Sequence, residues 1–377
     1  MNILQVDNWA SGKAGPVRGE DSLVESKTSD EPVQMWIINP VQNPGWDLVV
    51  ALHPDATCFH TTAWAKVLHK TYGHQPFYLQ FSRGRSLAAL VPLMEVHSAF
   101  TGRRGVCLPF SDLCEPLIFD SEVTDLVKDR IVDFARERCW KHLEIRGGKS
   151  FQSQSRLSAP PKFYGHTLVL RRSEEMADRF DSQVRRAIRK AERSNLTAQV
   201  DRTRGAMDDF YRLHVQTRRR HGLPPQPASF FLNIHEYMIK PGLGFVVLAR
   251  RGSRPIAAAV FFRFGKNAVY KYGASDKKFQ EFRPNNLVMW KGIRLLAREG
   301  AEKLHFGRTD FENSGLRRFK LSWDTHEESI DYFRVDPSGR QCSDPVRREG
   351  GLHKRVFGRL PLVFNRLAGS ILYPHLD

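Results

Sequence analysis

Apolar residues recur along this chain with two different periods, and the alternation of the two predicts a mixed α/β fold. An apolar face at helical spacing marks the segments 59–72, 126–140, 182–194, 207–221 and 286–299. Shorter apolar or alternating runs, which are typical of strands, lie at 35–40, 77–82, 87–96, 102–112, 142–148, 166–170, 303–308 and 329–335. Residues 245–275 predict three consecutive antiparallel strands, because Gly and Pro interrupt an otherwise apolar stretch at 252–255 and 265–267.

Polar segments divide these predicted elements into two halves, each a mixture of helices and strands. We predict a polar, Gly- and Ser-rich leader at 1–34 and a polar, Pro-rich boundary at 149–162. The first half then spans 35–150, and the second half spans 163–336. A tail follows at 337–377, which is basic first and apolar afterwards.

Charge and composition narrow the classes of partner. The 377 residues carry a formal net charge of +17, which predicts attraction to a polyanion such as CoA phosphates, tRNA, an anionic lipid or an acidic glycan. The chain has no apolar run of about 18 residues, so we expect no membrane-spanning helix. The first residues lack a basic start followed by an apolar block, so we expect no signal peptide and a cytoplasmic location.

The cysteines and histidines predict no metal site. The five cysteines include no CxxC pair, and no histidine cluster stands near them at zinc-binding spacing. We expect reduced and mostly buried thiols. The chain also lacks an HExxH motif and a Ser-His-Asp order, so hydrolytic chemistry of those kinds has no support.

Seven segments together resemble a known family. They are FHTTAWAKVLHKTYGHQPFYLQ, LVPLMEV and LPFSDLCEPLI in the first half, and VRRAIRKAERS, RRRHGLPPQP, YKYGASDKKFQEFRPNNLVMWKGI and HFGRTDFENSGLRRFKLSWD in the second. In this order and spacing, over roughly residues 55–335, the chain resembles the FemAB-like branch of the GNAT acyltransferases. That branch includes the peptidyltransferases of peptidoglycan bridges and the CelD-type proteins found with exopolysaccharide or cellulose synthesis.

The resemblance implies a fold and two classes of donor. It implies tandem GNAT-like halves, each with a mixed and mostly antiparallel sheet flanked by helices, and a groove between the halves. No cofactor is expected to stay bound, and the co-substrate is acyl-CoA or aminoacyl-tRNA. The Gly-rich pyrophosphate loop of ordinary acetyltransferases is missing before 286–299, which disfavours CoA. The coiled-coil arm of the bridge-forming enzymes has no room between 184 and 230, which disfavours tRNA.

The resemblance also implies catalytic residues. Phe319 and Lys320 align with the family's Phe-Lys pair near the reacting carbonyl, where a fixed ammonium would stabilise the developing oxyanion. Asp112 matches an acidic position that holds the acceptor amine or takes its proton. The alternative for Asp112 is a side chain that caps its own turn.

Other candidates follow from position. We predict that Tyr270 and Tyr272 share one face of a strand, with Tyr272 as a catalytic group and Tyr270 as a substrate contact. Residues 305–324 predict a strand end followed by a Gly-rich polar turn, in which Arg308 and Arg317 would clamp an anion. The helix at 286–299 would present its N-terminus, with the substrate contacts Arg283 and Asn286, to a phosphate of the donor.

The function predicted from these residues is transfer of an acyl or aminoacyl group to an amine of a cell-envelope or polysaccharide precursor. The acceptor is a small molecule or is lipid-linked, and the apolar tail at 356–373 either contacts an anionic membrane from the cytoplasmic side or docks on the body. A different hypothesis is a non-catalytic envelope or exopolysaccharide assembly protein on a degenerate GNAT scaffold. A third is a nucleic-acid binder.

Overall fold

The computed structural model describes residues 31–148, 163–171, 173–337 and 356–376. Most of the leader predicted at 1–34, and the boundary predicted at 149–162, lie outside the described residues. From Val33 onward the chain forms one compact unit. Within the part that the structure describes, no helix is both long and apolar enough to cross a membrane.

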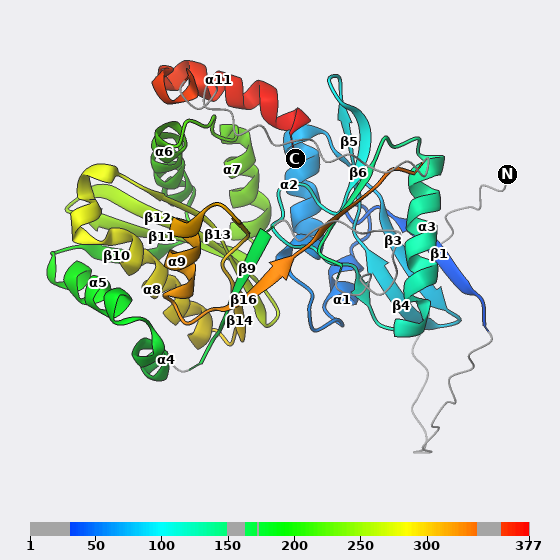
Figure 1. Ribbon diagram of the computed structural model, residues 1–377, viewed down its shortest axis with the longest axis horizontal. Helices are drawn as coiled ribbons and strands as arrows, with labels where there is room; N and C mark the ends of the chain where they lie inside the picture. The colour runs from blue at the N-terminus through cyan, green and yellow to red at the C-terminus, as the bar shows by residue number, and fades with distance from the viewer. Residues whose placement is uncertain (1–30, 149–162, 172, 338–355, 377) are drawn as a thin grey trace. The chain divides into compact units, whose positions relative to one another are not determined.

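The first half contains two sheets and three helices (Figure 1). The first sheet has the strand order β1-β3-β4-β7, and the second has the order β17-β8-β6-β5-β2. The elements are β1 Val33–Ile38, α1 Trp46–Val50, α2 Thr62–Tyr72, β2 Gln75–Pro76, β3 Tyr78–Arg83, β4 Ser86–Val91, β5 Met94–Ser98, β6 Gly102–Val106, β7 Leu117–Ile118, α3 Thr124–Glu137 and β8 Leu143–Arg146. A 3₁₀ turn, Cys58–His60, leads into α2.

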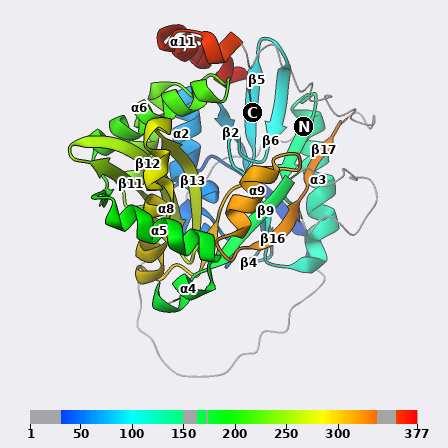
Figure 2. The ribbon, with the colours of Figure 1, turned by 60° about the vertical axis from the view of Figure 1, so that its left-hand side comes forward.

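The second half is built on one large mixed sheet (Figure 2). Its strand order is β10-β11-β12-β13-β14-β9-β15, with β16 also paired to β9, and the β13–β14 pair is parallel. The elements are β9 Phe163–Val169, α4 Ser173–Arg179, α5 Ser182–Arg193, β10 Thr197–Asp201, α6 Arg204–Arg220, α7 Ala228–Ile234, β11 Gly244–Arg251, β12 Arg254–Phe264, β13 Asn267–Ser275, α8 Pro284–Arg298, β14 Lys303–His305, β15 Thr309–Asp310, α9 Ser314–Leu321 and β16 His326–Ile330. The five predicted helices and the three strands of 245–275 are confirmed.

Two predicted strands are each divided between two sheets. The run at 87–96 breaks at Pro92, so that β4 stays in the first sheet while β5 joins the second. Proline has no backbone N–H for a ladder, which makes it a natural point for the chain to change sheets. The run at 329–335 breaks at Asp331: β16 pairs with β9, and β17, Tyr332–Val335, pairs with β8 of the first half. The last strand therefore links the two halves.

The prediction of a polar turn at 305–324 is wrong over its second part. Residues Ser314–Leu321 form the helix α9, and the Asn313 side chain caps it by accepting a hydrogen bond from the Leu316 amide at 3.1 Å. This segment shows no apolar helical period because most of α9 is exposed. Lys320 is the residue of α9 that is buried.

The two halves share one hydrophobic core. Trp64 of α2 packs edge-on against Phe230 of α7, at 6.1 Å between ring centroids, and lies 6.0 Å from the ring of Phe262 on β12. The same cluster extends to Tyr272 on β13. Because fully buried aromatic side chains contribute on the order of 2 kcal/mol each, this shared core holds the loops of the first half against the large sheet.

Candidate functional site

The candidate site forms where β13 and β14 separate. The two strands run parallel from the pair Asn267 and Lys303 to the pair Val269 and His305. Beyond this point β13 continues to Ser275, whereas the segment that follows β14 turns at Gly307. Gly307 has a φ of +73°, which a residue with a side chain rarely adopts. A Cβ at this position would lie 3.4 Å from the Asp112 carboxylate, so the first half meets the second at this turn.

Asp112 forms a largely buried ion pair with Lys271 of β13. The Lys271 Nζ donates to Asp112 Oδ2 at 2.7 Å, and the two side chains are 6% and 17% exposed, respectively. Burial alone would raise the pKa of Asp112, but the Lys271 ammonium outweighs burial and holds the pKa at about 2. The Asp112 carboxylate is therefore an anion at any physiological pH.

Lys271 is the extra residue of a β-bulge, and this changes the faces of its neighbours. Val260 pairs with Tyr272 and Phe261 with Tyr270, so Lys271 has no partner position on β12. The Tyr270 ring packs against Phe261 at 5.5 Å, whereas Tyr272 belongs to the core shared by the halves. The prediction that the two tyrosines share a face is wrong, because the bulge shifts the alternation by one residue.

Lys320 is buried on α9, on the other side of Gly307. Its Nζ donates to the carbonyl oxygens of Gly307 at 2.7 Å and Arg308 at 3.0 Å. An ammonium has three donors, so one remains for a further acceptor. Burial lowers the pKa of Lys320 to about 8, although the Asp112 charge opposes this shift. The ammonium form thus still dominates at pH 7.

The two predicted clamp arginines lie apart. The Arg308 guanidinium stacks over Phe163 at 4.4 Å from the ring centroid, and Arg317 stacks over Tyr164 at 4.3 Å. Adjacent residues of a strand point to opposite faces, so the two arginines sit on opposite faces of β9. Arg317 also makes a two-point contact with Glu327, at 2.8 and 2.7 Å. Arg308 lies near Asp112 and Arg317 does not, so the two arginines do not form one clamp.

Three other predicted contacts lie outside this group. Arg283 is exposed in a left-handed conformation just before α8, and Asn286 is half-buried in the first turn of that helix. Phe319 packs edge-on against Trp323, at 6.2 Å between ring centroids, at the border of the second half's own core. Their predicted roles at the donor stay predictions.

The loop that carries Asp112 is held in a strained conformation by a buried arginine. Leu108 and Phe110 have φ values of 53° and 60°, an unfavourable region for these side chains. Arg146 of β8 donates to the carbonyl oxygens of Leu108 and Ser111, at 3.3 and 2.8 Å. The Tyr332 hydroxyl donates to the Asp112 carbonyl at 2.7 Å. These contacts position Asp112 from both halves.

Arg146 in turn depends on Glu144. The Glu144 carboxylate accepts from the Arg146 Nε at 3.0 Å and from Arg334 of β17 at 2.8 Å. Burial would raise the pKa of Glu144, but the two guanidinium groups hold it at about 2. Sequence reasoning missed Lys271, Glu144 and Arg146. The available signal was charged side chains inside otherwise apolar strands, where they need partners.

A cavity of about 460 Å³ lies beside the group, between the first half and strands β13, β14 and β16. His305 lines it, with its Nδ1 accepting from the Gly307 amide at 3.1 Å and its Nε2 buried without a hydrogen-bond partner among the described residues. Three carboxylates, Asp55, Glu115 and Glu328, line it as well, against one lysine, Lys303, which lies 3.5 Å from Asp55. An acidic wall of this kind favours a cationic or amine-bearing ligand.

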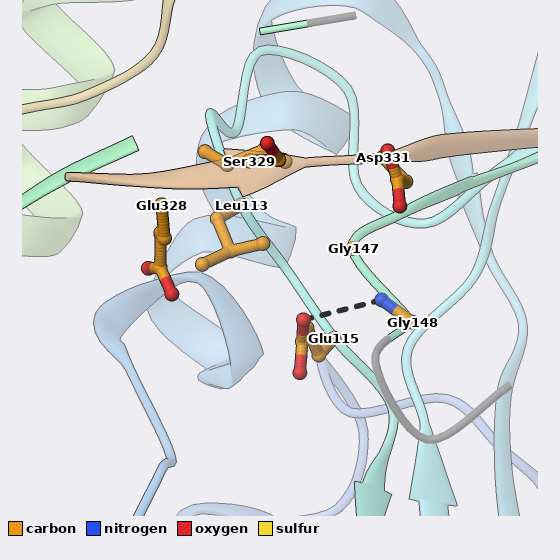
Figure 3. Close-up of a pocket in the computed structure, with 8 residues that line it drawn as sticks. Leu113, Glu115, Gly147, Gly148, Glu328, Ser329 and Asp331 are labelled. Atoms are coloured by element: carbon orange, nitrogen blue, oxygen red, sulfur yellow. Dashed lines mark hydrogen bonds between the residues drawn. The ribbon is translucent and has the colours of Figure 1, made fainter. Parts of the chain in front are cut away.

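A small pocket adjoins this cavity and shares Leu113, Glu115 and Glu328 with it. Figure 3 shows Glu115 accepting a hydrogen bond from the Gly148 amide at 3.2 Å, with Glu328 and Ser329 of β16 across from it. The acidic wall is therefore formed by both halves.

Comparison with known proteins gives a family match over part of the chain. Residues 178–321 match the acetyltransferase (GNAT) domain family. The chain is 32% identical to the lipid II:glycine glycyltransferase of Staphylococcus aureus over 85 residues, which are 21% of this chain and 20% of that protein. The corresponding protein of Staphylococcus haemolyticus is 31% identical over 85 residues. The chain thus spans about a fifth of the length of the relatives it matches.

Solved structures extend the likeness in fold to most of the chain. The crystal structure of FemX has a TM-score of 0.64 at 16% identity, and the match covers 80% of this chain and 96% of that one. The C-terminal domain of a putative lysylphosphatidylglycerol synthetase from Agrobacterium fabrum has a TM-score of 0.51 at 14% identity, covering 82% and 92%. A tandem GNAT protein of clavulanic acid biosynthesis has a TM-score of 0.50 at 8% identity, covering 83% and 100%.

Residues 178–321 are therefore an acyltransferase domain of the GNAT superfamily. Over most of its length the chain is similar in fold to FemX, and over 85 residues it is similar in sequence to the lipid II:glycine glycyltransferases. The fold class predicted from the sequence, tandem GNAT-like halves with mixed sheets flanked by helices, is confirmed.

Proposed function

We propose that this protein transfers an acyl or aminoacyl group from an activated donor to the amine of a lipid-linked cell-envelope precursor. One observation carries the proposal: Asp112 of the first half and Lys320 of the second flank the same turn at Gly307. A buried ammonium and a fixed carboxylate that both lie against one turn can serve the two ends of an aminolysis reaction.

The proposed transfer needs stabilisation of the oxyanion, and it needs no nucleophile of the protein that forms a covalent intermediate. The acceptor nitrogen attacks the carbonyl carbon, a C–N bond forms, and the ester C–O or thioester C–S bond breaks. The amine loses one proton, and the departing hydroxyl or thiol gains one. In this proposal the Lys320 donor that is not used by the carbonyls of Gly307 and Arg308 stabilises the negative charge on the reacting carbonyl oxygen.

Asp112 is suited to hold the amine. A carboxylate with a pKa of about 2 is a weak base, so it takes up few protons at neutral pH. As a fixed anion it can accept a hydrogen bond from the acceptor amine and orient its lone pair. Lys271 keeps the carboxylate ionised and in place.

The acceptor class is supported by the acidic cavity and by the relatives. The cavity beside His305 offers carboxylates to an amino group. The matched relatives are named as acting on lipid II with glycine. We therefore propose a lipid-linked amine as acceptor, with the protein working at the cytoplasmic face of the membrane.

The donor is tested by product formation. The protein is incubated with a lipid-linked or soluble amine acceptor and either acyl-CoA or charged tRNA, and the amide product is followed by mass spectrometry. We expect product with one of the two donors, and loss of product in Asp112→Asn. Absence of product with both donors, together with no thermal shift by either, would favour a non-catalytic assembly protein.

The pH dependence follows from Lys320. Its folded pKa of about 8 lies below the usual value of 10.5, and the protonated form is the one that stabilises the oxyanion. We expect the rate at saturating acceptor to fall as the pH rises through about 8. In Lys320→Arg the guanidinium stays charged, so any residual activity should lack this decline. The same decline in both proteins would assign it to another group.

A further inference from the structure

The C-terminal helix leaves large apolar side chains exposed to solvent. Helix α11, Leu362–Leu372, continues into a 3₁₀ turn at Tyr373–His375. Asn365 and Gly369 are buried, as is Tyr373 one turn later. A surface helix of a globular protein normally buries its apolar face and exposes its polar one. Here the residues buried within the helix are Asn365 and Gly369, the leucines Leu362 and Leu372 beside them are half-buried, and other large apolar side chains remain exposed.

The docking of this face is close and specific. A Cβ on Gly369 would lie 1.9 Å from the Pro225 carbonyl oxygen, so only glycine allows the helix to approach this near. Arg218 of α6 donates to the Tyr373 hydroxyl at 2.8 Å, and Arg104 of β6 donates to the His375 carbonyl at 3.0 Å. The helix is therefore held in one orientation against both halves.

The opposite face is apolar and exposed. We call it the α11 apolar face, and it consists of Val363, Phe364, Leu367 and Ile371, which are 73%, 59%, 56% and 54% exposed, respectively. At 100° per residue these positions fall within one arc of about 100°. Four large apolar side chains on one arc form a continuous stripe, which differs from the scattered exposed residues of an ordinary surface.

A second exposed aromatic lies at the same end of the fold. Phe100, at the turn between β5 and β6, is 73% exposed, and its ring lies 4.7 Å from that of His375. Figures 1 and 2 both show α11 and the β5–β6 turn at the same end of the fold. The ring contact between Phe100 and His375 makes the turn continuous with the C-terminal end of the helix.

The two segments that form this surface carry basic residues and no acidic ones. Residues 356–376 contain Arg359 and Arg366, both exposed, and no Asp or Glu. The β5–β6 segment, 96–106, contains the exposed Arg103 and no acidic residue, and its other arginine, Arg104, is buried against His375. Apolar side chains with basic flanks and no acidic ones are the composition of helices that lie in the interface of an anionic bilayer.

We propose that the α11 apolar face and Phe100 form a lipid-binding surface that seats the protein on an anionic bilayer. The helix lies parallel to the membrane plane, its apolar side chains enter the acyl boundary, and the arginines contact lipid phosphates. This contact goes beyond the transfer reaction and does not depend on it.

The test is flotation of the full chain with lipid vesicles of defined composition. We expect binding to phosphatidylglycerol–phosphatidylcholine vesicles at about 0.1 M salt, and weaker binding to phosphatidylcholine alone. Leu367→Glu should weaken binding by roughly tenfold or more, because it removes a large apolar group and adds a negative charge. Arg366→Gln should weaken binding to the anionic vesicles and leave binding to phosphatidylcholine unchanged.

A matched control separates binding through this surface from non-specific binding to lipid. Leu48 on α1 is 76% exposed and lies outside the surface, so Leu48→Glu should bind vesicles like the wild type. Equal binding of wild type and Leu367→Glu, or no binding of wild type to anionic vesicles, would overturn the proposal. A wild-type dimer that Leu367→Glu converts to a monomer, without vesicle binding, would instead assign the face to a second copy. Loss of transfer activity with vesicle binding intact would leave this proposal standing and reject the proposed function alone.

Discussion

Replacing Lys320 by alanine is expected to lower kcat by about 100- to 1,000-fold, with little change in the KM of the donor. The Lys320 ammonium is buried and prepositioned by two backbone carbonyls, so its remaining donor interacts with the reacting carbonyl without reorganisation. That interaction is strongest when the oxygen carries negative charge, which is why the loss should fall on kcat. Steady-state kinetics on the folded variant checks this result.

The matched control is Lys70→Ala. Lys70 is an exposed lysine on α2, so its removal should leave both kinetic parameters unchanged. Lys320→Ala also leaves two carbonyl oxygens without their donor, and we expect a loss of about 1–3 kcal/mol in the free energy of unfolding. A folded Lys320→Ala protein with wild-type kcat would remove Lys320 from the mechanism.

Replacing Glu144 by glutamine is expected to lower the free energy of unfolding by about 3–5 kcal/mol. The substitution leaves Arg146, which is 2% exposed, as a buried charge without its carboxylate. It also removes an acceptor from Arg334, so the contact between β8 and β17 weakens. Chemical denaturation followed by circular dichroism measures the change.

A surface pair provides the comparison for Glu144. Glu122 also contacts an arginine, Arg83, at 3.0 Å, but its side chain is 69% exposed, so Glu122→Gln should cost less than about 1 kcal/mol. The Glu144 pKa of about 2 is depressed from 4.5, so the pair's contribution is present above pH 4.5 and is lost as the pH falls toward 2. Equal effects of the two substitutions would contradict the role given to the buried pair.

The sequence predicted the elements of this fold better than their pairing. Helices such as α5 and α8 follow from a local period, because each buries one face. The change of sheet at Pro92 and at Asp331 depends on which distant strand offers a partner, and no local period records that choice. The bulge at Lys271 is similar: an alternating Tyr-Lys-Tyr run reads as a regular strand until the partner strand is known.

The candidate site was likewise predicted only in part. Asp112 and Lys320 were found through the resemblance, and the structure brings them to one turn. Lys271, Glu144 and Arg146 were missed because each acts through a residue far away in sequence. The prediction for Arg317 as an anion clamp rests on its place in the polar turn at 305–324, yet its guanidinium is engaged by Glu327 on the other face of β9. Long-range ion pairs of this kind become visible only once the sheet is assembled.

The central claim is that the donor carbonyl binds at Lys320, beside the Gly307 turn and opposite Asp112. The most direct measurement is a crystal structure of the protein with an unreactive amide or thioether analogue of whichever donor supports the reaction. The account predicts the analogue's carbonyl oxygen at hydrogen-bond distance, about 2.7–3.2 Å, from the Lys320 Nζ. An analogue bound elsewhere, with Lys320 still bonded only to the carbonyls of Gly307 and Arg308, would contradict it.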